Sequence, residues 1–495
     1  MLRAVSRWRS AGGLGLAVGA LAAFYLWTYG DCIGCFFHFD DFWVLGAAAA
    51  IRIESLWDIG QFFRPIHGFV LYRPVSTVLY FWSLHQVFGY DPTGYHAAQI
   101  AFHVLNAVLV YLIADDLFAS RPLALAATLT YATAPGHAIA VCWNALFTIT
   151  GTALFYFLGL WAWLRFDSRW RRPITFLLFL VALLASEHAV SLPVALTLAD
   201  VLLPPRPDWR RIAVQQWPFY VVSIAYVGFK LYYFHYLLDR AFPTPAAQIY
   251  VRAGYGLTFD PQAVLQHLGQ YVGFSLDAAY GLAGQPASAL GVGALLAAAA
   301  VLSSVGVLTG RWTSRSLRVA TFGIDLFIVA LGPVLMLQAH LYSYYVGIAG
   351  LGMALAVVGF ARAVPWRFAA VGPATVVTSL LAVHVLWTAS LVHRSKEFEF
   401  FDHFSRSAAR WLYTLSVLPP TRSIDEVVVP RGALTGLVFE AGQAHRLFLC
   451  ASYQVRTSDA IDQEQERPGR VVLAAPMPDA AVPQSLAWLR HACRR

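Results

Sequence analysis

Two adjacent carboxylates, Asp40 and Asp41, are well suited by type and position to acid–base chemistry. They follow the first long apolar run of the chain, where a carboxylate is costly to keep and is therefore a functional candidate. One of them could take the proton of an acceptor hydroxyl group while that hydroxyl attacks an anomeric carbon. A helix N-cap followed by a solvated acid is the structural alternative, and the dipeptide alone favours neither.

Three basic side chains could meet a phosphate group. Arg64 and Arg73 each precede a proline in the segment after the two acids, and an arginine fork binds phosphate oxygens in a bidentate manner. Lys230 is one of two lysines in the chain and lies in the apolar run 221–236. Such donors stabilise the negative charge that develops on a leaving phosphate. The alternative is that these side chains extend from apolar segments to the membrane interface.

Further polar side chains interrupt the apolar runs at three turns. They are His137, Asn144, Glu187, His188, His340, Tyr342 and Tyr345. An acid and an imidazole between apolar runs are costly unless they are paired or bind something. Substrate hydroxyl groups would account for them, as would a divalent metal held by Asp40, Asp41 and Glu187. A histidine–glutamate hydrogen bond and a tyrosine belt at the lipid interface are the structural alternatives.

The composition indicates what kind of scaffold must hold these residues. Hydrophobic residues make up 58% of the 495 residues and charged residues only 13%, against about 25% charged in soluble domains. The mean hydropathy is +0.58. Since so little charge cannot cover a water-facing surface, we predict an all-α polytopic membrane protein. The net charge of +8 follows from loop arginines, so it gives no indication of nucleic-acid binding.

Arginine clusters and apolar runs together predict the topology. Basic residues gather at 3–9, 121, 165–172, 206–211, 311–318 and 362–367, and each cluster should be cytoplasmic. About eleven transmembrane helices are expected, near 11–29, 96–115, 122–136, 143–164, 174–187, 189–203, 214–236, 288–309, 319–338, 343–361 and 368–392. We assign the segment 72–88 to an interfacial helix, because counting it as a span would place 165–172 outside.

The predicted outer segments are then 31–95, 135–144, 186–188, 236–287, 338–345 and the tail. The candidate residues lie in these segments, on one side of the membrane, except Lys230, which lies near the outer end of its apolar run. The N-terminus is expected in the cytoplasm, and the tail outside. We divide the chain into a transmembrane domain, 1–392, and a small extracytoplasmic α/β domain, 393–495, with apolar runs at 427–429 and 471–475 and a helical stalk through Trp411. Cys32 and Cys35 form a C-x-x-C outside the first helix; these two and the tail cysteines at 450 and 493 leave several pairings open.

Several motifs resemble a known family. Besides the acidic pair and the Tyr-Arg-Pro step at 72–74, they are the octapeptides at 89–96 and 186–193 and the tyrosine-rich turn at 342–345. Over positions 10 to 365 this order resembles the GT-C glycosyltransferases, and among them the protein O-mannosyltransferase-like members. Relatives often have Lys-Glu where this chain has Ser186-Glu187, and an Arg-Tyr-x-Tyr-Leu-Pro motif where it has 340–345.

The resemblance implies a membrane enzyme that takes its sugar from a dolichyl- or undecaprenyl-phosphate carrier and inverts the anomeric centre. It implies Asp40, or in its place Asp41, as the catalytic base, Arg73 as a donor to the lipid phosphate, and Glu187 in the substrate cavity. The expected partners are the lipid-linked sugar, membrane lipid and an extracytoplasmic protein or glycan, with the bacterial inner membrane as the location. The family includes metal-dependent and metal-independent branches.

Two other functions compete with this one. A transporter or flippase for a lipid-linked glycan would have inverted repeats and charged residues near mid-membrane. Most charge in this sequence instead lies in predicted outer loops or at cytoplasmic helix ends. An inactive scaffold with the fold of the enzyme is the third hypothesis, because fold alone does not establish activity.

Overall fold

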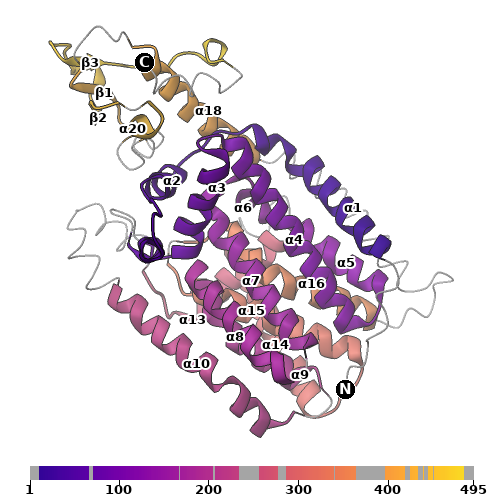
Figure 1. Ribbon diagram of the computed structural model, residues 1–495. Helices are drawn as coiled ribbons and strands as arrows, with labels where there is room; N and C mark the ends of the chain where they lie inside the picture. The colour runs from indigo at the N-terminus through magenta and orange to yellow at the C-terminus, as the bar shows by residue number, and fades with distance from the viewer. Residues whose placement is uncertain are drawn as a thin grey trace. The chain divides into compact units, whose positions relative to one another are not determined.

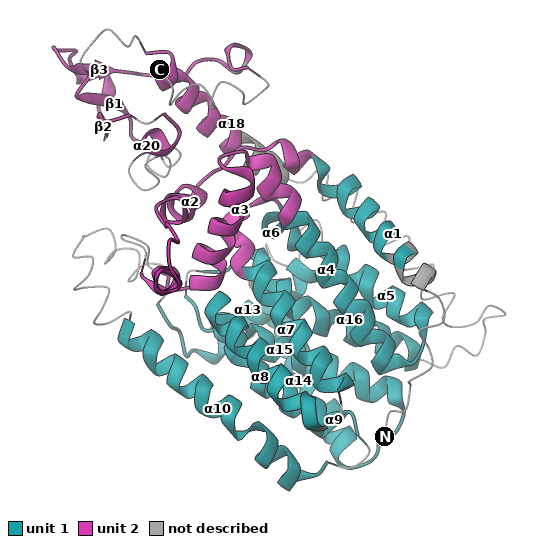
Figure 2. Ribbon diagram, viewed as in Figure 1, with its two compact units in different colours: residues 1–30, 99–141, 149–395 teal, residues 31–98, 142–148, 396–495 magenta. Residues whose placement is uncertain are grey.

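The structure is a computed structural model. It describes residues 11–65, 71–166, 168–204, 207–233, 256–276, 286–338, 340–363, 396–418, 424–432, 439, 444–449 and 451–483. The chain divides into two compact units (Figure 2). Unit 1 comprises Met1–Gly30, Gln99–Val141 and Ile149–Ser395; unit 2 comprises Asp31–Ala98, Cys142–Thr148 and Lys396–Arg495. Each unit is therefore assembled from stretches that are distant in sequence.

The regular elements in the described part of unit 1 are helices (Figure 1), and an isolated antiparallel bridge joins Leu257 to Leu337. Its long helices are α1 (Ala11–Tyr29), α4 (Pro92–Phe118, which begins in unit 2), α7 (Phe147–Arg165), α8 (Ser168–Ala185), α10 (Trp209–Tyr232), α13 (Pro261–Leu276), α14 (Pro286–Leu308), α15 (Arg315–Leu335) and α16 (Val346–Ala363). Its shorter helices are α5 (Arg121–Ala132), α6 (His137–Cys142), η5 (Glu187–Ser191), α9 (Leu192–Leu202) and η7 (Ser343–Tyr345).

Six helical segments of the described residues are long and apolar enough to cross a membrane. They are Pro92–Phe118, Asn144–Arg165, Trp209–Tyr232, Ala287–Leu308, Arg315–Leu335 and Ser343–Ala363. Each coincides with a predicted span. The predicted spans near 122–136 and 189–203 contain α5 and α9, of 12 and 11 residues. Such helices are about 18 Å long, short of a hydrocarbon core of about 30 Å. The predicted span at 368–392 lies outside the described residues.

Helices α13 and α14 pack through a pair of glycines. A Cβ at Gly269 would lie 1.7 Å from the carbonyl oxygen of Ala289, and one at Gly293 would lie 1.8 Å from that of Leu265. Only backbone without side chains fits at this crossing. Close approach through small residues is the usual way in which membrane helices associate, since lipid gives little hydrophobic drive between helices. The sequence placed residues 236–287 in an outer loop and gave no indication of α13.

Unit 2 begins with short helices around the acidic pair. They are η1 (Gly30–Gly34), α2 (Asp41–Ala49), η2 (Leu56–Phe63), the π-helix η3 (Pro74–Leu79), α3 (Tyr80–Phe88) and η4 (Asn144–Leu146). Helices η3 and α3 follow one another without a break and occupy the segment predicted as an interfacial helix. Pro74 fits the first position of η3, where no backbone donor is needed, and Gly89, with φ of 56°, ends α3.

The tail adds a helix and a small sheet to unit 2. Helix α18 (Lys396–Ser416) carries the buried Trp411. Strands β1 (Glu426–Pro430), β2 (Gln454–Ser458) and β3 (Arg470–Val472) form a parallel sheet in the order β2-β1-β3, with α20 (Ala444–Leu449) between β1 and β2 in sequence. The apolar run predicted at 427–429 is the buried centre of β1. The domain boundary expected at 392–393 lies outside the described residues.

Candidate active site

A strained turn presents the two carboxylates. Phe39 has φ of 50°, a left-handed conformation that is uncommon for a residue with a side chain. The amide of Asp41 donates a hydrogen bond of 3.1 Å to the carbonyl of His38, which closes the turn. Asp40 is the N-cap residue of α2 but makes no side-chain cap hydrogen bond. The capping alternative therefore does not account for the side chain of Asp40.

Asp41 is held in place by backbone donors from two segments. Its Oδ1 accepts a 2.7 Å hydrogen bond from the amide of Ala145, and its Oδ2 a 3.2 Å bond from the amide of His38. The side chain of Asn144 also bonds to this carboxyl group. Burial raises the pKa of Asp41 to about 8, although these hydrogen bonds lower it. A fully buried acid with fixed donors is suited to positioning its neighbours.

Asp40 differs from its neighbour in exposure and in charge environment. It is partly exposed, whereas Asp41 is completely buried. Burial raises the pKa of Asp40 to about 6, and the positive charge of Arg73 lowers it. The predicted base and the predicted phosphate-binding arginine therefore interact within unit 2. A carboxylate with this pKa is ionised at neutral pH and still basic enough to take a proton.

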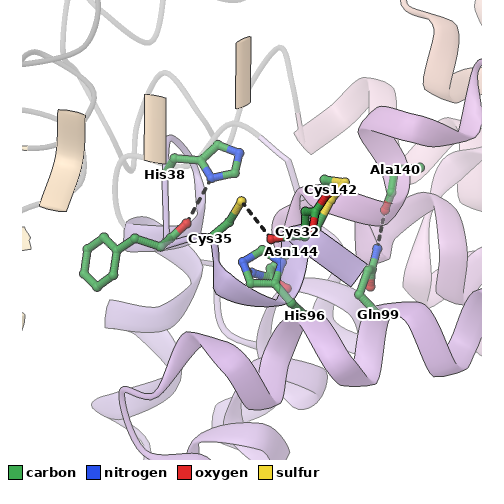
Figure 3. Close-up of a disulfide and its surroundings, with 10 residues drawn as sticks. Cys32, Cys35, His38, His96, Gln99, Ala140, Cys142 and Asn144 are labelled. Atoms are coloured by element: carbon green, nitrogen blue, oxygen red, sulfur yellow. Dashed lines mark hydrogen bonds between the residues drawn. A yellow bond between two sulfur atoms is a disulfide. The ribbon is translucent and has the colours of Figure 1, made fainter. Parts of the chain in front are cut away.

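A disulfide bond joins the start of unit 2 to the loop that holds Asp41 (Figure 3). Cys32 pairs with Cys142, 110 residues later, with a Cα–Cα distance of 5.3 Å. Cys35, the other cysteine of the C-x-x-C, is buried outside this disulfide. Asn144 lies two residues beyond Cys142, and the distance from its Nδ2 to the Nε2 of His96 is 3.1 Å. No role was predicted for Cys142 from the sequence, and His96 was placed at the end of the octapeptide 89–96 without a function assigned to its side chain.

Residues of the tail pack on the segment before the acids. The amide of Phe36 donates a 2.6 Å hydrogen bond to the Oγ of Ser405 in α18. The ring of Phe39 lies 4.5 Å from that of Phe404, between centroids. In α20, Phe448 contacts Phe36 at 5.4 Å, and also Phe37 and Phe42. The tail therefore helps to fix the strained turn, a role that its composition did not indicate.

In unit 1, the structure pairs several of the predicted polar residues. Lys230 Nζ lies 3.4 Å from Glu187 Oε2, and the lysine side chain is nearly buried. This contact argues against simple extension of Lys230 to the interface. His188 Nδ1 lies 2.8 Å from the Oγ of Ser186, and its ring lies 5.0 Å from that of Tyr345.

The remaining predicted residues have separate surroundings. The ring of His340 lies 5.4 Å from that of Tyr342, which is exposed and stacks on Tyr344 at 5.1 Å. The buried His137 lies 4.6 Å from Tyr131 and 5.4 Å from His103, between ring centroids. Arg64 is exposed after η2. Among the described residues, no three His, Cys, Asp or Glu side chains gather at a spacing that could hold a metal ion.

The chain is similar to known proteins both in sequence and in structure. No protein-family model matches the chain. The chain is 32% identical over 136 residues to the protein O-mannosyl-transferase Tmtc1 of Drosophila melanogaster, which covers 27% of this chain and 16% of that protein. This similarity confirms the resemblance to protein O-mannosyltransferases that the motifs indicated. The crystal structure of ArnT from Cupriavidus metallidurans bound to undecaprenyl phosphate matches with a TM-score of 0.40 and 15% identity, over 87% of this chain and 85% of that one.

Proposed function

We propose that this chain is a membrane glycosyltransferase of the GT-C superfamily that moves a sugar from a polyprenyl-phosphate donor to a hydroxyl group outside the cytoplasm. The observation that carries the proposal is the electrostatic interaction of Asp40, a partly exposed carboxylate at the start of α2, with the buried Arg73, whose positive charge lowers the pKa of Asp40. The similarity to an O-mannosyl-transferase of Drosophila supports the same chemistry. The helices that could cross a membrane provide access to a lipid donor.

In this mechanism Asp40 acts as the general base. It accepts the proton of the acceptor hydroxyl as the hydroxyl oxygen attacks the anomeric carbon and the bond from that carbon to the phosphate oxygen breaks. The electron pair of the broken bond passes to the phosphate, and the configuration at the anomeric carbon inverts. Arg73 stabilises the charge that develops on the leaving phosphate. Before a donor binds, its charge keeps Asp40 ionised.

Asp41 has a positioning role in this proposal. Its carboxyl group is occupied by the amides of His38 and Ala145. Since the two acids are adjacent, this anchoring fixes the direction in which Asp40 projects from the strained turn. We assign the Lys230–Glu187 pair to substrate binding, in which Lys230 supplies a cation.

The disulfide supports an extracytoplasmic location for the site. Disulfide bonds persist in oxidising compartments and are rare in the cytosol. Cys32 lies in the predicted outer segment 31–95, and Cys142 in the predicted outer segment 135–144. Their pairing agrees with the side of the membrane that the arginine clusters assign to both segments.

The test is a direct transfer assay. Purified protein in detergent is incubated with mannosyl, glucosyl and galactosyl polyprenyl phosphates, and release of polyprenyl phosphate is measured with and without an extract of outer-surface glycans and proteins. We expect release with one donor class, and none from the matched Asp40→Asn variant. A transporter would move the lipid-linked sugar across proteoliposomes and leave the sugar–phosphate bond intact. That outcome, or equal release by the variant, would overturn the proposal.

A further inference from the structure

We propose that the Cys32–Cys142 disulfide is a positioning device for the two acids, so that sugar transfer requires the oxidised protein. This inference rests on the proposed function. It concerns two segments of unit 2: the acidic turn, residues 38–41, and the clamp segment, residues 142–146. The clamp segment supplies the amide that holds Asp41, and the disulfide attaches this segment to the chain just before the acidic turn.

The clamp segment reaches Asp41 within three residues of the disulfide. Ala145 donates its amide to Asp41 at 2.7 Å, and Asn144 bonds both to the same carboxyl group and to His96. Cys142 is the last residue of α6, so the disulfide marks the point where the helix ends and the clamp segment begins. Only two or three residues separate the cross-link from these donors, and Figure 3 shows Asn144 beside the disulfide.

The same cross-link closes a small ring with the acidic turn. One branch of this ring is the chain from Cys32 to Asp41, nine residues later, and the other is the chain from Cys142 to Ala145. The Asp41–Ala145 hydrogen bond joins the two branches. Without the disulfide, these branches are connected through 110 residues of chain. Bringing together the ends of so long a segment costs conformational entropy, and the covalent bond removes that cost locally. The disulfide therefore favours the hydrogen-bonded arrangement of the clamp segment.

Loss of the clamp would act on the turn that holds Asp40. Phe39 is in a left-handed conformation, which persists only while its surroundings enforce it. If Ala145 moved away, the buried carboxyl group of Asp41 would lose a donor and the turn would relax. A displacement of about 1 Å at a catalytic group can cost about 10²-fold in rate. Donor affinity should change less, because Arg73 lies on another segment and neither cysteine adjoins it.

The redox step is a thiol–disulfide exchange. Two thiol groups of a reductant such as dithiothreitol transfer two electrons and two protons to the Cys32–Cys142 bond. The bond breaks to give two cysteine thiols, and the reductant is oxidised to a cyclic disulfide. Both cysteines are buried, with 1% and 0% of their surface exposed, so substitution is a more direct way than reduction to open the bond in the folded protein.

The test compares full-length protein with and without the cross-link. We would measure turnover per folded molecule, affinity for a polyprenyl-phosphate analogue, and hydrogen exchange of the peptide that contains residues 143–147. For the double variant Cys32→Ser/Cys142→Ser we expect a loss of turnover on the order of 10²-fold, little change in affinity and faster exchange of this peptide. Cys35→Ser is the matched control, since Cys35 is buried nearby but outside the disulfide. It should retain wild-type turnover and exchange.

A second variant tests the clamp with the disulfide intact. Ala145→Pro removes the amide that donates to Asp41, and it should lower turnover to a similar extent without exposing new thiols. Wild-type turnover and exchange in both variants would overturn the inference. If exchange accelerates as expected but the oxidised wild-type protein transfers no sugar from any donor, the clamp is established and the proposed function fails instead.

Discussion

The carboxyl group of Asp41 and the amide of Ala145 form a 2.7 Å hydrogen bond across 104 residues of sequence. This bond gives the adjacent acids different environments. Asp41 is enclosed by donors, whereas Asp40 is partly exposed and interacts with Arg73. These environments support the proposal that Asp41 is a positioning acid and Asp40 the base, which is the order that the family resemblance implied.

The first prediction uses the two amide substitutions. Asp40→Asn should abolish transfer while folding and donor binding stay close to wild type, because the change keeps the shape but removes the proton acceptor. Asp41→Asn should lower turnover only in part, and it should also lower the free energy of unfolding by about 1–3 kcal/mol, since an amide nitrogen would face a buried backbone donor. Turnover, analogue binding and thermal unfolding are measured for both. Near-wild-type turnover of Asp40→Asn would exclude Asp40 as the base.

The second prediction concerns pH. A base must be ionised, so kcat/KM should fall as the pH drops through about 6, the pKa of Asp40. The positive charge of Arg73 lowers this pKa. Loss of that charge in Arg73→Ala should therefore move the acid limb, which is the fall of kcat/KM at low pH, to higher pH. Arg73→Lys keeps the charge and should leave the limb close to its wild-type position. An acid limb that does not respond to Arg73→Ala would contradict the interaction between these side chains.

The third prediction separates the phosphate role of Arg73 from a structural one. Turnover should fall in the order Arg, Lys, Ala, with a loss for alanine on the order of 10²-fold, because lysine keeps the charge but not the bidentate fork. Both variants should also bind a polyprenyl-phosphate analogue more weakly. If yield and melting temperature change while turnover per folded molecule and analogue affinity stay flat, Arg73 is structural.

The fourth prediction tests the contact between Lys230 and Glu187. Lys230 Nζ and Glu187 Oε2 lie 3.4 Å apart. The single changes Lys230→Glu and Glu187→Lys each place two like charges at this contact and should lower both stability and activity. The double exchange should recover part of the loss. We expect a coupling free energy of up to about 1 kcal/mol, since Glu187 keeps contact with solvent. Strictly additive effects would show that the pair has no energetic significance.

The fifth prediction tests the topology with single cysteines. Trp57 in η2 and Trp209 at the start of α10 have 93% and 60% of their surface exposed. In a background with Cys450→Ser and Cys493→Ser, a membrane-impermeant maleimide should label Trp57→Cys in intact cells. Trp209→Cys, beside the arginines at 210 and 211, should be labelled only after permeabilisation. The reverse pattern would place the acidic pair in the cytoplasm.

The sequence predicted those parts of the structure that depend on local pattern. Six candidate spans and the helix within 72–88 were predicted from runs of apolar residues, because burial in lipid or in a core requires such runs. The apolar run at 427–429 was noted in the sequence and is the buried centre of β1. The acidic pair was found because charge beside a membrane is costly. The short helices α5 and α9 were predicted as spans because hydropathy does not reveal where a helix ends inside a bundle.

The contacts that define the site depend on tertiary structure and left no local pattern. Ala145 bonds to Asp41 through its backbone N–H, a group that every residue type except proline has. No sequence motif can therefore mark Ala145 as a partner of Asp41. Cys142 lies in an apolar stretch, and its pairing with Cys32 rather than Cys35 depends on the path of 110 intervening residues. The contact between Lys230 in α10 and Glu187 in η5 likewise depends on the fold and not on a local sequence pattern.

The hydrogen bond between Phe36 and Ser405 has a consequence for biosynthesis. The ribosome synthesises the acidic turn before most of the described membrane helices, but α18 and α20 emerge only after those helices have been made. The turn therefore gains these contacts only once residues 396–449 have been translated. A chain that stops before residue 396 would contain both acids and the disulfide, yet it would leave Phe36 and Phe39 without these partners. Such products should be recognised by proteolysis as incomplete and should not accumulate as partly active enzyme.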